Sequence, residues 1–250
     1  MIEVDNPFLK PLSSQRYYQA IKYIKQQKPS FLIDFGCNQC GFIQYLANNP
    51  QSLDFVIGLD KDSNVLAKGY RDLLSRTSII YEKSRKFGIF LIKEDISNLS
   101  DEFIRNYRNC PIISLIEVIE HLNPIDVDKA VVCIFQKLRP ISVFITTPNQ
   151  EYNSIIQDSF GKSNQQFRHS DHKFEWKRSE FHSWCMWICE NYGYTSTIGG
   201  IGKCVNDNDD GTMGWASHYA FFTRDSSYQW SFSPPIKRLY GLSFNVNIDK

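Results

Sequence analysis

Short apolar runs and longer amphipathic stretches alternate along most of this chain. The apolar runs end at glycine, acidic or polar positions, which is typical of buried strands. They predict strands over residues 31–35, 55–60, 88–92, 112–116, 141–146, 194–198 and 217–223. Apolar residues spaced three or four positions apart predict helices over residues 13–27, 42–47, 63–74, 124–138 and 179–191. The alternation predicts a mainly parallel sheet with helices on both faces.

The last two predicted strands are joined without an evident crossover helix. The connection, residues 199–214, is rich in glycine and aspartate. A parallel pair needs a long crossover, so this connection predicts an antiparallel strand at one edge of a seven-stranded sheet. We therefore expect one α/β domain over residues 13–224, after a lead of residues 1–12 and before a C-terminal extension of residues 225–250.

The composition is that of an ordinary globular protein. Of the 250 residues, 42% are hydrophobic and 22% charged, and the net charge of +1 neither indicates nor excludes nucleic-acid binding. The seven cysteines form no disulfide framework, which favours a reducing compartment. The first residues do not read as a secretory signal, and no run approaches the roughly 18 apolar residues of a membrane span. We expect a cytoplasmic monomer that does not enter a membrane.

The loop after the first strand is a candidate site for a nucleoside cofactor. Residues 34–41 read DFGCNQCG, and small residues at a strand-to-helix turn let a ligand approach backbone amides. An acid ending the second strand can bind the hydroxyls of a ribose, and one after the third strand can border an adenine. The candidate cofactor-binding residues are Asp34, Gly36, Cys37, Gly41, Asp60 and Asp95. A plain turn of an α/β protein is the alternative.

Cys37 and Cys40 also form a C-x-x-C pair within this loop. Zinc binding or redox chemistry would need a second pair or a thioredoxin-like context. Neither is visible in the sequence, so this alternative is the weaker one.

A second candidate site follows the fourth strand, where Glu117, Glu120 and His121 occur within five residues. If Glu117 begins a helical turn, the three side chains fall within an arc of about 100°. A bound cation would relieve the repulsion between the two carboxylates, and an oxygen and imidazole set suits Mg²⁺, Mn²⁺ or Co²⁺. The alternative is that these are ordinary helix acids beside a histidine of the core.

The polar segment of residues 147–177 is too long for a plain connector and is expected to be functional. Its residues 167–176 hold two histidines, two acids and three aromatics, and can provide a further metal ligand. The aromatics Phe174 and Trp176 can pack around a terminal nucleotide or can belong to the core, and the sequence favours neither.

Several of these segments together resemble one family, the Hua-enhancer family of small-RNA 3′-terminal 2′-O-methyltransferases. The similar segments are PLSSQRY at 11–17, EVIEH at 117–121, TTPNQEYN at 146–153, FRHSDHKFEWKR at 167–178, GGIG at 199–202 and GWAS at 214–217. The resemblance covers roughly residues 7–224 and is to the catalytic domain alone, as in the animal members. It implies a Rossmann-like class I methyltransferase fold, with S-adenosylmethionine as the cofactor of the first candidate site.

The resemblance also implies the roles of individual residues. Glu117, Glu120, His121 and His172 would be catalytic as ligands of a divalent metal, Mg²⁺ or alternatively Mn²⁺ or Co²⁺. The metal would also bind the 2′- and 3′-hydroxyls of the last nucleotide of a single-stranded small RNA, of the piRNA or siRNA type. The RNA-binding candidates are Arg16, Pro148, Asn149, Arg168, Lys173 and Arg178. An Argonaute- or Piwi-type protein is an expected partner, and cytoplasmic RNA granules are an expected location.

Three points stay open at the level of sequence. Either His121 or His169 can relay the proton of the hydroxyl. A methyltransferase acting on a protein or small molecule would keep the cofactor loop without a metal. A catalytically idle module that only holds RNA ends would keep the second site and lose cofactor binding.

Overall fold

The computed structural model describes residue 8 and residues 10–48, 50–77, 87–159, 167–204 and 212–227. Most of the predicted lead and nearly all of the predicted extension lie outside these ranges, so both stay predictions. Within the described ranges, no helix has the length and apolar character needed to cross a lipid bilayer.

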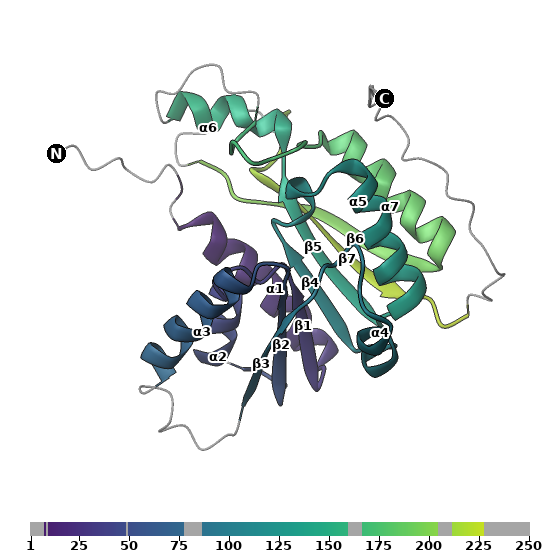
Figure 1. Cartoon of the computed structure of the whole chain (residues 1–250). Helices are drawn as coiled ribbons and strands as arrows, with labels where there is room; N and C mark the ends of the chain where they lie inside the picture. Colours follow the sequence, from purple (N-terminus) through teal and green to yellow (C-terminus); the bar gives the residue numbers. More distant parts are fainter. Residues whose placement is uncertain are drawn as a thin grey trace, which may run out of the picture.

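The seven strands form one sheet in the order β3-β2-β1-β4-β5-β7-β6 (Figure 1). The strands are β1 (Phe31–Phe35), β2 (Phe55–Asp60), β3 (Gly88–Lys93), β4 (Ile112–Ile116), β5 (Ser142–Pro148), β6 (Tyr194–Ile201) and β7 (Ser217–Arg224). The first five pair in parallel, while β7 runs antiparallel to both β5 and the edge strand β6. The predicted mainly parallel seven-stranded sheet, with antiparallel pairing at one edge, is confirmed.

All five predicted helical segments are present, with bounds within three residues of those expected. The α-helices are α1 (Leu12–Gln27), α2 (Gly41–Asn48), α3 (Ser63–Thr77), α4 (Asp101–Tyr107), α5 (Pro124–Val131), α6 (Asn153–Ser159) and α7 (Arg178–Tyr192). The segment predicted as one helix over 124–138 continues from α5 into a π-helical turn, η2 (Val132–Leu138). The sequence reading missed α4 and α6, each of seven residues, although Ser100 caps α4 by accepting a hydrogen bond from the Phe103 amide.

Two hydrophobic cores lie on opposite faces of the sheet. One packs α1, α2 and α3 against the strands through residues such as Ile24, Ile43 and Leu66. The other packs α4, α5 and α7 through residues such as Phe103 and Trp184. Both faces of the central strands are therefore covered, as expected for parallel strands (Figure 1).

The polar segment of residues 147–177 contains a 3₁₀ turn, η3 (Gln150–Tyr152), then α6, and returns to the sheet at a bridge between Asn149 and Trp176. Phe174 and Trp176 are buried there, and Trp176 packs against the rings of Phe174 and Trp184. The core interpretation of these two aromatics is therefore confirmed, and their packing around a nucleotide is excluded by their burial.

Truncation of Trp176 tests this assignment. The side chain is 2% exposed, so Trp176→Ala should lower the free energy of unfolding by about 3–5 kcal/mol, because it leaves a cavity between α7 and the sheet. Chemical denaturation measures this cost. The matched control is Trp215→Ala, because Trp215 is 45% exposed and its loss should cost roughly 1 kcal/mol or less. Equal costs for the two changes would contradict the assignment.

Candidate active site

The loop between β1 and α2 turns sharply through three residues with left-handed backbone, Gly36, Asn38 and Cys40. Only glycine fits at position 36, because a Cβ there would lie 2.8 Å from both γ-methyl groups of Val118. Asparagine enters the left-handed region more readily than most residues, which suits position 38. The turn brings the amide of Asn38 within 3.0 Å of the Asp60 carboxylate.

Asp60 fixes two neighbouring loops at the end of β2. One carboxylate oxygen accepts from the Asn38 amide and the other, also at 3.0 Å, from the Asp62 amide. Asp34 lies deeper, where the Ser114 hydroxyl donates to it at 2.7 Å. Burial, with the nearby charge of Asp60, raises the pKa of Asp34 to about 7, although the hydrogen bond from Ser114 opposes the rise.

The two cysteines of this loop are free thiols with different surroundings. Cys37 lines the pocket, whereas Cys40 is buried against α3, where a Cβ on Gly69 would lie 2.6 Å from its sulfur. A hydrogen bond with Cys40, burial and the charges of Asp34 and Asp60 all raise the pKa of Cys37. Among the residues that the structure describes, neither thiol joins a group that could hold a metal.

A pocket of about 740 Å³ opens over the ends of the parallel strands. All six candidate cofactor residues line it: Asp34, Gly36, Cys37, Gly41, Asp60 and Asp95. The sequence reading missed other lining residues, among them Tyr17, Glu94 and Asp171. Tyr17 was visible only as an apolar position of α1, because nothing in the sequence tells which helix face meets a pocket.

The condition on which the predicted arc of three side chains depended, a helical turn beginning at Glu117, does not hold. Glu117 does not begin a helical turn, because its backbone is left-handed and its amide still bonds to Thr146 of β5. The helical turn starts later, as η1 (Ile119–His121). One Glu117 oxygen pairs with the Arg16 guanidinium at 2.7 Å, and the other accepts from the Thr146 hydroxyl at 2.9 Å.

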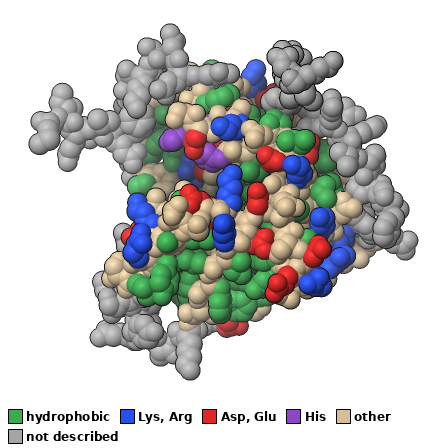
Figure 2. All heavy atoms as spheres, in the orientation of Figure 1, with side chains coloured by type: hydrophobic (Ala, Val, Ile, Leu, Met, Phe, Trp, Pro, Cys, Tyr) green, Lys and Arg blue, Asp and Glu red, His purple; other side chains and the backbone are tan. Residues whose placement is uncertain are grey.

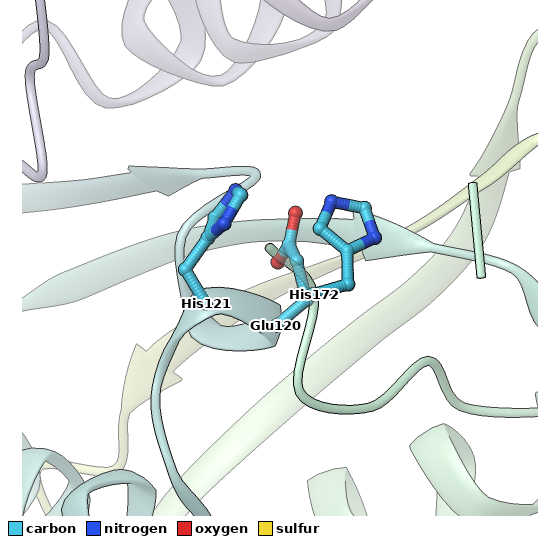
Figure 3. A group of neighbouring side chains, drawn as sticks. All are labelled: Glu120, His121 and His172. Carbon is cyan, nitrogen blue, oxygen red and sulfur yellow. The ribbon is translucent and has the colours of Figure 1, made fainter. Parts of the chain in front are cut away.

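The other three predicted ligands do come together. Potential ligand atoms of Glu120, His121 and His172 all lie within 4.8 Å of one another, and Figure 3 shows the three side chains converging. Glu117 is not part of this group. In Figure 2, histidine side chains meet the surface beside acidic and basic ones.

Glu120 is buried with only part of its hydrogen-bonding capacity used. Its Oε2 accepts from the Thr147 hydroxyl at 3.0 Å, but its Oε1 has no hydrogen-bond partner within the described part of the chain. Burial, and then the charge of Glu117, raises the pKa of Glu120 well above its usual value. The backbone carbonyl of Glu120 accepts from the Lys173 amide at 2.8 Å, which joins η1 to the segment carrying His172.

The two histidines each meet a carboxylate through Nδ1. His172 contacts Glu175 at 2.5 Å, and His121 contacts Asp171 at 3.0 Å. Burial lowers the pKa of His121 despite the opposing charge of Asp171, which favours the neutral imidazole that a metal requires. His169 is exposed and also contacts Asp171.

The six RNA-binding candidates fall into two groups. Arg16 and Lys173 line the pocket, and Arg178 is exposed but bonds to Glu151. Pro148 and Asn149 are inside the protein, at the end of β5. The side-chain amide of Asn149 donates to the carbonyls of Met213 and Trp215, and the Arg168 guanidinium donates to the carbonyls of Asn149 and Ala216. The side chains of Asn149 and Arg168 therefore join the residue after β5 to the residues before β7. RNA contacts by any of the six stay predictions.

The fold defines the protein's class: it is a Rossmann-like class I methyltransferase fold, as predicted. The crystal structure of the small RNA methyltransferase HEN1 superposes with a TM-score of 0.75 and 29% identity, over 91% of this chain and 28% of that chain. The methyltransferase domain of bacterial CtHen1 gives a TM-score of 0.67 and 25% identity, over 85% of this chain and 99% of that chain.

Sequence comparison gives the same result. The small RNA 2′-O-methyltransferase of Xenopus tropicalis is 31% identical over 219 residues, which are 87% of this chain and 56% of that protein. The chain thus spans about half the length of this relative. No protein-family model matches the present chain. The resemblance to small-RNA 2′-O-methyltransferases that the motifs indicated is confirmed.

The raised pKa of Glu120 predicts a cost in stability that substitution should remove. The ionised carboxylate is disfavoured in the folded state, so metal-free Glu120→Gln should melt at a higher temperature than the wild type at neutral pH. Each kcal/mol gained corresponds to about 2–4 °C in a chain of this size.

The gain in melting temperature from Glu120→Gln should be largest at pH values above the raised pKa of Glu120 in the folded protein. It should disappear as the pH falls toward the ordinary glutamate value of 4.5, because both proteins are then neutral at this position. Calorimetry across this pH range, with a chelator present, measures the difference. An equal or lower melting temperature for Glu120→Gln at neutral pH would contradict the assignment.

Proposed function

We propose that this protein transfers the methyl group of S-adenosylmethionine to the 2′-hydroxyl of the 3′-terminal nucleotide of a single-stranded small RNA, of the piRNA or siRNA type, with the help of a divalent cation. One observation carries the proposal: the same pocket is lined by Gly36 of the β1–α2 loop, by Asp60 at the end of β2, and by His121, one of the three converging candidate metal ligands. A methyl donor and a metal-bound hydroxyl would therefore share one pocket. Similarity to small RNA 2′-O-methyltransferases supports the RNA substrate.

The cofactor end of the pocket supplies suitable chemistry. Asp60, at the end of β2, would accept hydrogen bonds from the two hydroxyls of the cofactor ribose, and Asp95 borders the position expected for the adenine. The left-handed turn at Gly36 and Asn38 brings backbone close to the ligand without a side chain intervening. S-adenosylmethionine would supply the methyl group to be transferred.

The side chains of Glu120, His121 and His172 offer a set of ligand atoms that fits a hard or borderline cation. Glu120 offers a buried oxygen that lacks a partner among the described residues, and His121 and His172 offer imidazole nitrogens. A bound Mg²⁺ or Mn²⁺ would lower the pKa of the sugar hydroxyl and so make it a better nucleophile. Glu117 stays in the proposal as a fourth ligand because it lines the same pocket, although Arg16 and Thr146 bind its carboxylate here.

The remaining groups of the pocket would orient the RNA end. Lys173 is exposed and lines the pocket, so its ammonium group would meet a backbone phosphate, whereas Arg16 is held by Glu117 and by the Ser217 hydroxyl. His121 and His169, which both contact Asp171, stay candidates for accepting the hydroxyl proton. Because Glu120 is fully buried, electrostatic interactions with its carboxylate are stronger than they would be in water.

The requirement for metal is tested with a short single-stranded RNA and labelled S-adenosylmethionine. Methyl transfer should stop in EDTA and return with Mg²⁺ or Mn²⁺, and His172→Ala should lower the rate by at least the roughly 10–100-fold that loss of an outer-shell partner costs. The same RNA with a 2′,3′-dideoxy end, or oxidised by periodate, should accept no methyl group. Full activity in EDTA would favour a metal-independent methyltransferase with another substrate.

The cofactor assignment is tested by calorimetric titration with S-adenosylhomocysteine. Asp60→Ala should weaken binding by about 10–100-fold for each hydrogen bond that it removes, because a hydrogen bond to a charged acceptor is worth roughly 1.5–3 kcal/mol. Asp62→Ala is the matched control: Asp62 is a neighbouring exposed acid that does not line the pocket, and this variant should bind like the wild type. No binding by the wild type would instead favour a catalytically idle RNA-end-binding module.

A further inference from the structure

Glu175 lies beneath His172, on the side away from the other candidate ligands. Its Oε1 contacts His172 Nδ1 at 2.5 Å, and the side chains of His172 and Glu175 are 7% and 0% exposed. Figure 3 shows one ring nitrogen of His172 directed toward Glu120 and the other directed away from it. Because Nδ1 is bound to Glu175, the nitrogen facing Glu120 is Nε2.

Which nitrogen carries the proton decides whether this histidine can bind a metal. A neutral imidazole has one N–H and one lone pair, and a carboxylate at Nδ1 accepts the N–H from that position. The lone pair is then on Nε2, which faces Glu120 and His121. Histidine ligands of metal sites commonly donate the other ring N–H to a carboxylate in this way.

Glu175 is itself held in place by two further donors. The Arg168 amide donates to Oε1 at 2.7 Å, and the Asn153 side-chain amide donates to Oε2. Burial raises the pKa of Glu175, but the hydrogen bonds from His172, Asn153 and Arg168 more than offset this and lower it below the ordinary value. Asn153 also accepts from the Arg168 guanidinium, so α6 and the His172 segment form one network.

We propose that Glu175 is a positioning residue of the metal centre: its buried carboxylate, fixed by Arg168 and Asn153, holds His172 with Nε2 toward Glu120 and His121. This role rests on the proposed function, because it requires that the three residues bind a cation. The carboxylate that contacts His121 is less constrained, because the side chain of Asp171 is 56% exposed. The two histidines are therefore held differently, and His172 is the one fixed in advance.

The test is the affinity of the protein for Mn²⁺, measured by calorimetric titration. Glu175→Gln keeps the shape of the side chain but removes its charge, and should weaken Mn²⁺ binding by about 10–100-fold. Its affinity for S-adenosylhomocysteine should not change, because Glu175 does not line the cofactor pocket. Glu151→Gln is the matched control: Glu151 is a carboxylate of the same region that bonds to Arg178 rather than to a candidate ligand, and this variant should bind Mn²⁺ like the wild type.

A double-mutant cycle separates positioning from a general structural role. In a His172→Ala background, Glu175→Gln should have no further effect on Mn²⁺ affinity, because the residue through which Glu175 acts is gone. Wild-type affinity in Glu175→Gln, or an equal loss in both backgrounds, would overturn the positioning role. Absence of Mn²⁺ binding by the wild type would instead overturn the metal centre, and this role with it.

A measurement on the unmodified chain keeps the proposal testable if Glu175→Gln fails to fold. The side-chain ¹⁵N spectrum of the metal-free wild type, recorded at alkaline pH where imidazole is neutral, reports the tautomer of each histidine. The His172 signals, assigned from their absence in His172→Ala, should be those of the Nδ1–H tautomer. The Nε2–H tautomer would overturn the proposal.

Discussion

Burial of the Glu120 carboxylate is the constraint around which this site is arranged. An ionised carboxylate in a protein interior is costly unless a proton, a hydrogen-bond donor or a cation compensates it. Thr147 satisfies one oxygen, and the other has no partner in the described residues but faces two imidazoles. Ionisation of Glu120 is therefore unfavourable in the metal-free protein, and a divalent ion bound by this group would make it favourable.

The parallel sheet explains why this group adjoins a cofactor loop. The carboxyl ends of β1, β2, β4 and β5 lie at the same edge, so the loops that follow them share one pocket. The antiparallel strand β7 then closes this region, because Arg168 and Asn149 bond to the carbonyls of Ala216 and Trp215, the two residues just before it. In the structure, the polar side chains of Asn149 and Arg168 therefore hold this edge of the sheet together.

The sequence predicted the parallel strands well because they are mainly apolar runs bounded by polar residues, whereas β6 and β7 mix apolar and polar positions. The sequence could not predict the backbone geometry at Glu117. The Glu117 amide stays bonded to Thr146 of β5, and Val118 packs against Gly36 before the helical turn η1 begins. Three of the four expected ligands were nevertheless brought together, because η1 presents Glu120 and His121 and the Lys173 amide anchors the segment of His172 to it. The spacing of three residues between His172 and Glu175 was the one feature of the sequence that could have indicated their contact. Spacing alone does not show that Glu175 is buried or that Arg168 and Asn153 bind it.

The central claim is that one cation is bound by the carboxylate of Glu120 and the imidazoles of both histidines. Electron spin-echo spectroscopy of Mn²⁺ bound to the protein measures it most directly, because the modulation reports nitrogen atoms coordinated to the ion. The account predicts modulation from two imidazole nitrogens, reduced to one when either His121 or His172 is replaced by alanine. Bound Mn²⁺ that shows no nitrogen modulation would contradict it.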